Sequence, residues 1–226
     1  MSGARAESPM SPVEAEVLRT RRLMEAADYA AALETGLTLL QRVPENRDVL
    51  YMIAVSQRYM RQTAQALITL ARLEELHPGY SRLFQERGHC FLAGGDPAAA
   101  LDSYLRAVNL NAALPASWKA LQVLFRSAGQ PDEAQTAASH VAKLASLPGA
   151  VVAASSLFAD GEVHEAERVI RQFLQTNSTD IEAMRLLARI GMKLDVLDDA
   201  EFLLESVLAF APTYHLARYD LSLIHI

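Results

Sequence analysis

A residue type that returns at a fixed interval constrains this chain more than any other feature. Alanine recurs with spacings of 34, 34, 34, 32 and 34 residues, at Ala32, Ala66, Ala100, Ala134, Ala166 and Ala200. Pro44, Pro78 and Pro212 each follow one of these alanines by 12 residues. Self-similarity at such a period indicates a repeat architecture in which each unit packs on its neighbours.

Alignment on the alanines divides the chain into units of two helices each. We expect full units at 13–46, 47–80, 81–114, 115–146, 147–180 and 181–214, and a partial unit at 215–226. Gly95, Gly129 and Gly161 lie between the two expected helices of their units, where glycine ends a helix well. Residues 1–12 are rich in Ser, Ala and Pro, so we expect a disordered leader there.

The third and fourth units carry the most regular motifs. The third has Phe84, Gly88, Phe91, Ala100, Tyr104 and Ala107 at positions 4, 8, 11, 20, 24 and 27 of the unit. The fourth has Trp118, Leu121, Phe125 and Ala134 at positions 4, 7, 11 and 20. This pattern resembles that of the tetratricopeptide repeat family. The resemblance implies an all-α, right-handed α-solenoid of about six helical hairpins plus a truncated seventh.

Two units depart from the pattern. Arg87 stands at position 7 of the third unit, where the family has Leu. The fifth unit has only alanines, Ala150, Ala153 and Ala154, at positions 4, 7 and 8. Its second helix keeps the apolar spacing of Ala166, Ile170 and Phe173, so we still expect a hairpin. The stretch 150–159 carries no charge, and such a stretch forms an apolar interaction patch unless other residues cover it.

Composition limits the possible functions. The chain has 226 residues, is 51% hydrophobic and has a formal net charge of −6 without a long basic run, which argues against nucleic-acid binding. No apolar stretch is long enough to cross a membrane, so we expect a cytoplasmic protein. The six histidines have no metal-binding spacing, and we expect neither a metal nor a cofactor. Cys90 is the single cysteine, and we expect it to be a buried thiol rather than a nucleophile activated by His89.

The family resemblance also predicts a binding surface. In this family the first helix of each hairpin lines a concave groove, with positions 2, 5, 6, 9, 12 and 13 facing it. These positions hold Tyr51, Val55, Arg58, Tyr59, Arg82, Gln85, His89, Lys119, Val123, Arg126, Arg185, Arg189 and Lys193. Their basic and aromatic character predicts a protein or peptide partner that carries carboxylates. The alternative is that they are ordinary solvated side chains. Val123 stands where the chaperone-binding subclass has a polar clamp residue, which argues against a receptor for chaperone tails.

Two classes of function follow. The first is an interaction scaffold that is not itself an enzyme. The second is the non-catalytic N-terminal arm of a bacterial sulfotransferase, because the Ala/Leu-rich units and the segments 180–188 and 198–205 are similar to the repeats of that group. In the second case a catalytic domain follows residue 226 and is a possible intramolecular partner of the repeats.

Overall fold

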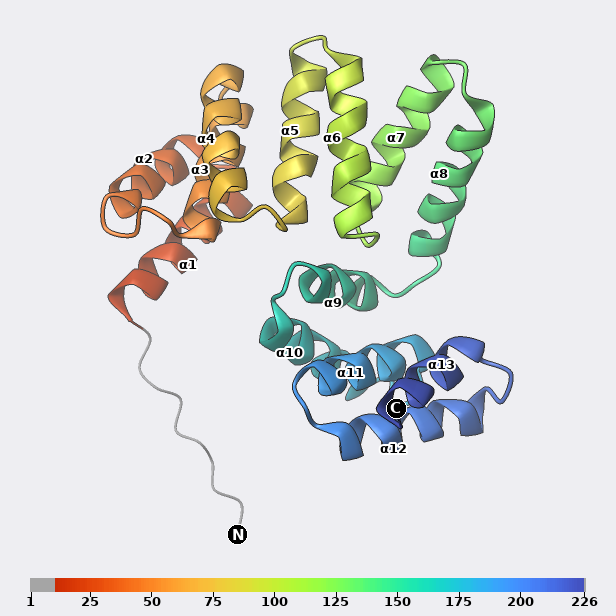
Figure 1. The fold of residues 1–226 in the computed structure, drawn as a ribbon. Helices are drawn as coiled ribbons and strands as arrows, with labels where there is room; N and C mark the ends of the chain where they lie inside the picture. The colour runs from red at the N-terminus through yellow and green to blue at the C-terminus, as the bar shows by residue number, and fades with distance from the viewer. Residues whose placement is uncertain (1–10, 226) are drawn as a thin grey trace. The chain divides into compact units, whose positions relative to one another are not determined.

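The computed structural model describes residues 11–225 of the chain, and within this range it contains 13 helices and no strand (Figure 1). The helices are α1 (Pro12–Glu25), α2 (Tyr29–Leu40), α3 (Arg47–Tyr59), α4 (Thr63–Leu76), α5 (Ser81–Ala93), α6 (Pro97–Leu110), α7 (Pro115–Ser127), α8 (Pro131–Ala145), α9 (Gly149–Ala159), α10 (Val163–Leu174), α11 (Ile181–Lys193), α12 (Leu197–Phe210) and α13 (His215–Ile224). The chain divides into two compact units, Met1–Arg106 and Ala107–Ile226, here called the N-terminal and the C-terminal unit. The predicted leader falls mostly on residues 1–10, which lie outside the described range.

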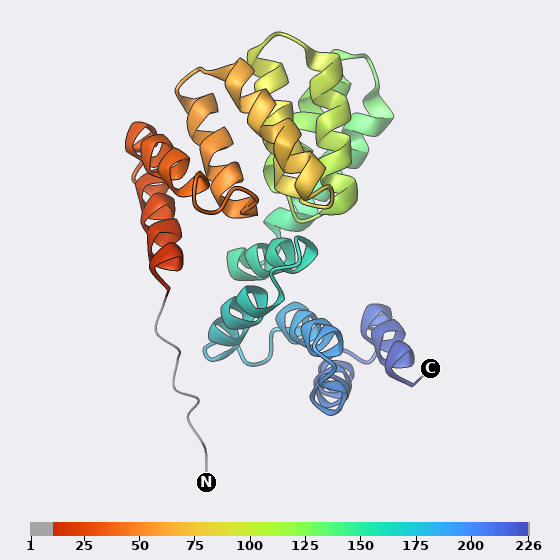
Figure 2. The same ribbon diagram turned by 60° about the vertical axis from the view of Figure 1, so that its left-hand side comes forward.

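Neighbouring helices pair as hairpins within each unit. In the N-terminal unit α1 packs on α2 and α3 packs on α4, and in the C-terminal unit α7/α8, α9/α10 and α11/α12 form the corresponding pairs. The second helix of one pair also packs on the first helix of the next, as α2 does on α3 and α10 does on α11. Figure 2 shows the same pairs from another direction. The prediction of an all-helical chain of repeated hairpins is confirmed.

The recurring alanines lie where the helices of a hairpin approach each other. Five of the six are completely buried, and the sixth, Ala134, is 6% exposed. The close approach is clearest between α5 and α6, where a Cβ atom on Gly88 would meet the ring of Tyr104 at 2.7 Å. Any larger side chain at position 88 would therefore push α6 away, so small residues at these positions set the spacing of the helices.

The turn inside each hairpin uses the same backbone conformation at position 15 of its unit. Gly95, Gly129 and Gly161 have φ of 78°, 71° and 83° there, and glycine adopts these values without steric cost. The other three hairpins place Ala27, Arg61 and Asp195 at φ of 58°, 61° and 61°. The repeat thus imposes a left-handed turn residue even where the sequence offers no glycine.

Side-chain caps fix where several helices begin. The carboxylate of Asp28 accepts a hydrogen bond from the Ala31 amide, and Asp180 does the same for Ala183. Proline opens α7 and α8, a position that suits its missing N–H group. These local signals fix where α2, α7, α8 and α11 begin.

The fifth hairpin departs from regular stacking where the alanine spacing shortens to 32 residues. Pro148 stands between α8 and α9, and the two helices turn by 116° at this break. No single described helix is long and apolar enough to cross a membrane, and α8 and α9 reach that length and composition only when they are taken together as a bent pair. The apolar stretch 150–159 is partly covered by the chain itself: Val151 and Ala154 are buried in a cluster with Ile170 and Ile190, whereas Ala153 and Ala159 are exposed.

Candidate functional site

The first helices of the N-terminal unit, α1, α3 and α5, contact one another in sequence order and present the predicted binding residues. We call the outward faces of these helices the first-helix surface. Seven predicted site residues lie on α3 and α5, and they differ widely in exposure. Val55 is only 5% exposed and offers a partner almost no surface, because nearly every side chain from Val49 to Gln57 is buried on this helix.

An ion pair joins α3 to α5 at the centre of this surface. The Nε of Arg58 donates to Oε2 of Glu86 at 2.6 Å, and the side chains are 19% and 6% exposed. Burial lowers the pKa of Arg58, but the charge and hydrogen bond of Glu86 outweigh this effect, and the net pKa of the guanidinium is raised. The arginine therefore stays charged and is held in one orientation. A guanidinium has five N–H donors, and four of them lie on its two terminal nitrogens.

An aromatic pair lies beside the ion pair. The rings of Tyr29 and Tyr59 stack with centroids 4.1 Å apart and planes 4° from parallel, and the guanidinium carbon of Arg58 lies 4.2 Å from the centroid of Tyr59. Tyr59 is 51% exposed. Its ring is thus immobilised by two neighbours while much of its surface remains accessible, which is the character of an interface anchor residue.

Further aromatic contacts extend the surface toward the start of α3. Tyr51 packs edge-on against Tyr80 with ring centroids 5.5 Å apart, and the guanidinium of Arg47 lies over the Tyr80 ring at 4.6 Å. Burial raises the pKa of Tyr51 well above its ordinary value, and the Glu86 carboxylate adds to this shift. Arg82 and Gln85 are half-buried and have interaction partners of their own within the chain.

His89 is engaged inside the third hairpin. Its Nδ1 lies 2.6 Å from the hydroxyl of Tyr104, and burial lowers the pKa of the imidazole. The neighbouring Cys90 is completely buried, and burial raises the pKa of its thiol to about 11. The expectation of a buried thiol is confirmed, and its raised pKa favours the protonated form at neutral pH.

The remaining predicted residues belong to the C-terminal unit. Lys119, Val123 and Arg126 are exposed on α7. Arg185 on α11 donates from Nε to Oδ2 of Asp220 on α13 at 2.6 Å, with side chains 16% and 6% exposed. Arg189 is exposed on α11, and its guanidinium lies 5.5 Å from the Phe158 ring centroid.

The structure adds partners and unit assignments to the predicted groove residues. Arg58 and Arg185 are each bound to a buried carboxylate, so the surface is less basic than the predicted positions alone suggest. Seven of the predicted residues lie in the N-terminal unit and the other six in the C-terminal unit. Glu86 and Asp220 were missed, although both stand at position 6 of their units, which the family pattern directs to the same face as the arginines.

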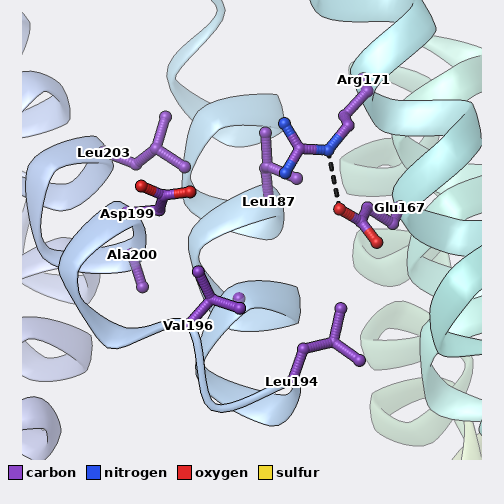
Figure 3. Close-up of a pocket in the computed structure, with 9 residues that line it drawn as sticks. Glu167, Arg171, Leu187, Leu194, Val196, Asp199, Ala200 and Leu203 are labelled. Atoms are coloured by element: carbon purple, nitrogen blue, oxygen red, sulfur yellow. Dashed lines mark hydrogen bonds and ion pairs between the residues drawn. The ribbon is translucent and has the colours of Figure 1, made fainter. Parts of the chain in front are cut away.

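Hollows lie elsewhere in the part of the chain that the structure describes. The hollow between α10, α11 and α12 contains the Glu167–Arg171 ion pair, as Figure 3 shows, and has a volume of about 20 Å³, which suffices for a water molecule. A shallower hollow between α1 and α2 is lined by Glu16 and Arg42, which are paired with each other at 2.7 Å. Residues 11–225 contain no group of three or more potential metal ligands.

Comparison with known proteins supports the fold. The structure titled for the functional characterization of Pseudomonas aeruginosa pilF is 14% identical, with a TM-score of 0.54 over 94% of this chain and 96% of that chain. A tetratricopeptide repeat protein from Parabacteroides merdae is 14% identical, with a TM-score of 0.49 over 97% of this chain and 88% of that one. YrrB, described as a TPR protein with an unusual peptide-binding site, is 14% identical, with a TM-score of 0.47 over 83% of this chain and 97% of that chain.

Sequence comparison matches a shorter part of the chain than the structural comparison does. No curated protein sequence matches the chain significantly. Neither the matching family model nor the similar structures support a link to sulfotransferases, which stays a prediction. The family model that matches describes a tetratricopeptide repeat and covers residues 48–80, the second predicted unit. The chain therefore contains a tetratricopeptide repeat at α3 and α4, within a fold built from repeated helical hairpins.

Proposed function

We propose that the chain is a protein-interaction module whose N-terminal unit binds an acidic peptide segment of another protein on its first-helix surface. Tetratricopeptide arrays use such surfaces to bind proteins and peptides. The observation that carries the proposal is the arrangement of Arg58, which Glu86 holds through Nε and which lies against the ring of the exposed Tyr59.

Charge and rigidity favour a carboxylate as the group that is bound. The helices α3 and α5 carry four arginines, against the two carboxylates of Asp48 and Glu86; the arginines are Arg47, Arg58, Arg82 and Arg87. The terminal nitrogens of a guanidinium match the two oxygens of a carboxylate, and an arginine already held in place loses little entropy on binding. An aromatic or apolar side chain next to the acid would pack on Tyr59.

Random dodecapeptides displayed on phage test this proposal when they are selected on the full chain. The matched variant is Arg58→Gln combined with Glu86→Gln, which removes both charges together and leaves no uncompensated buried ion. The wild-type chain is expected to enrich peptides with Asp or Glu, and the double variant to bind them roughly tenfold or more weakly, because a charge-assisted hydrogen bond is lost.

The control variant is Arg42→Gln, which removes an exposed arginine that pairs with Glu16 away from α3 and α5. It is expected to bind the selected peptides as the wild type does. Enrichment of neutral or basic peptides, or equal binding by the Arg58/Glu86 double variant, would show that the proposal is wrong.

A further inference from the structure

We infer that the C-terminal unit carries a second binding site, on α11 and α13, for an extended segment with carboxylates at alternate residues. The inference rests on the proposed function in that it takes the first helices to be the partner-binding faces. Its residues belong to the C-terminal unit alone, so it can be tested separately from the site on α3 and α5.

The two units place acids and tyrosines at the same positions of the repeat, whereas the arginines that bind the acids differ, Arg58 at position 12 and Arg185 at position 5. Asp220 stands at position 6 of its unit, as Glu86 does, and each buried acid binds the Nε of an arginine from the preceding first helix at 2.6 Å. Tyr80 and Tyr214 both stand at position 34. The guanidinium of Arg47 lies 4.6 Å from the ring centroid of Tyr80, and that of Arg185 lies 6.0 Å from the ring centroid of Tyr214.

A hydrogen bond also holds Glu182, the other acid on α11 and α13, near the Arg185–Asp220 pair. The hydroxyl of Tyr214 donates to Oε1 of Glu182 at 2.7 Å. Both carboxylates of the site are thus engaged by groups of the chain, Glu182 by Tyr214 and Asp220 by Arg185. Tyr219, next to Asp220 on α13, is 62% exposed, as Tyr59 is exposed next to Arg58.

A row of cations distinguishes the second site from the first. Arg185, Arg189 and Lys193 follow one another at intervals of four residues on α11, so they share one face of the helix. Arg189 and Lys193 are exposed. On α3 the same three positions hold Tyr51, Val55 and Tyr59, so the first site has no such row.

The spacing of the row defines the ligand. Four residues of an α-helix rise about 6 Å, and alternate residues of an extended chain are about 6.7 Å apart. Acidic side chains at every second residue of an extended segment therefore match consecutive cations on α11. Three cations outnumber the two engaged carboxylates, so the local charge attracts such a segment.

Fluorescence polarisation of a labelled Glu-Thr-Glu-Thr-Glu peptide with the full chain at low ionic strength tests the inference. Two comparison peptides are Gln-Thr-Gln-Thr-Gln, which lacks the charge, and Glu-Glu-Glu-Thr-Thr, which keeps the charge but not the spacing. The alternating acidic peptide is expected to bind at least about tenfold more tightly than the neutral one and several-fold more tightly than the contiguous one.

The decisive variant is Arg189→Gln/Lys193→Gln, whose two side chains are exposed and whose loss leaves the Arg185–Asp220 pair intact. Its control is Arg168→Gln/Arg171→Gln on α10, which removes the same charge from side chains 64% and 56% exposed. Binding of the alternating peptide is expected to fall about tenfold or more in the first variant and to change less than twofold in the second.

Three results would overturn the inference: no binding of the alternating peptide, equal loss in both variants, or no loss in the Arg189/Lys193 variant. The Arg58→Gln/Glu86→Gln variant separates the two sites. If it alone abolishes binding, the second site is rejected while the proposed function stands. If the phage selection fails on the wild-type chain, the proposed function itself is rejected.

Discussion

Arg58 and Glu86 lie 28 residues apart in the chain, yet the Nε of the first binds Oε2 of the second at 2.6 Å. The contact exists because α3 and α5 belong to consecutive repeats and lie against each other in the N-terminal unit. Removing one member of a buried ion pair leaves the other desolvated and uncompensated, whereas removing both avoids this cost.

We therefore expect Arg58→Gln and Glu86→Gln each to lower the free energy of unfolding by about 3 kcal/mol. The double variant should be more stable than either single variant, because two neutral amides need no countercharge. Urea denaturation of the four proteins measures this difference. A double variant that is less stable than both single variants would contradict the role given to the pair.

The contact between Gly88 and Tyr104 gives a second prediction. A Cβ atom at position 88 would lie 2.7 Å from ring atoms of Tyr104, whose hydroxyl is bound to His89 and whose ring is fully buried. The ring has no room to move, so Gly88→Ala is expected to destabilise the chain by about 1–3 kcal/mol through overpacking.

Gly79→Ala is the matched control, because nothing lies within 4 Å of a Cβ atom at position 79. Thermal or urea unfolding of both variants makes the comparison. Equal stability of the two alanine variants would show that helices α5 and α6 can separate at little cost.

The repeat period predicted most of the fold because it reports packing directly. Only a small side chain fits at position 20, where two helices meet, so the recurrence of alanine located every hairpin, including the fifth, whose first helix lacks the large motif residues. The break between α8 and α9 had a signal in the 32-residue spacing and in Pro148. The angle of that break could not be predicted, since it depends on packing and not on a local pattern.

The site was less predictable because the charges of its residues depend on partners in other repeats. The repeat pattern predicted which face of its helix Arg58 occupies, but the pairing of Arg58 with Glu86 follows from the contact of two helices. Arg87 replaces the usual Leu at position 7, and the structure explains it: Nη2 of Arg87 binds Glu74 at 2.5 Å in the preceding repeat. Single-residue patterns identify such a position as unusual without identifying the compensating acid.

The turn residues give a third, reciprocal prediction. Gly129 has φ of 71° and Ala27 has φ of 58° at the same position of their units. A non-glycine residue pays about 1 kcal/mol or more in this conformation. Gly129→Ala is therefore expected to lower the free energy of unfolding by about 1 kcal/mol, and Ala27→Gly to raise it by a smaller amount, because glycine also gains entropy in the unfolded chain. Urea unfolding checks both, and changes of the same sign would contradict the shared turn geometry.

Alkaline unfolding tests the burial of Cys90. Burial raises the pKa of this thiol from 9.0 to about 11 in the folded chain. The unfolded chain therefore loses the proton at a lower pH than the folded chain does, and the stability that the neutral thiol contributes is complete below pH 9.0 and is lost as the pH rises to about 11. At the upper end the loss is on the order of 2–3 kcal/mol.

Cys90→Ala has no thiol to titrate, so its free energy of unfolding should fall less steeply between these pH values than that of the wild type. The small cavity left by the substitution lowers stability equally at every pH and does not change this slope. Burial raises the pKa of the nearby Tyr104, which is present in both proteins and contributes to both slopes. Urea denaturation at several pH values measures the two slopes, and equal slopes would show that the Cys90 thiol ionises as readily in the folded chain as in the unfolded one.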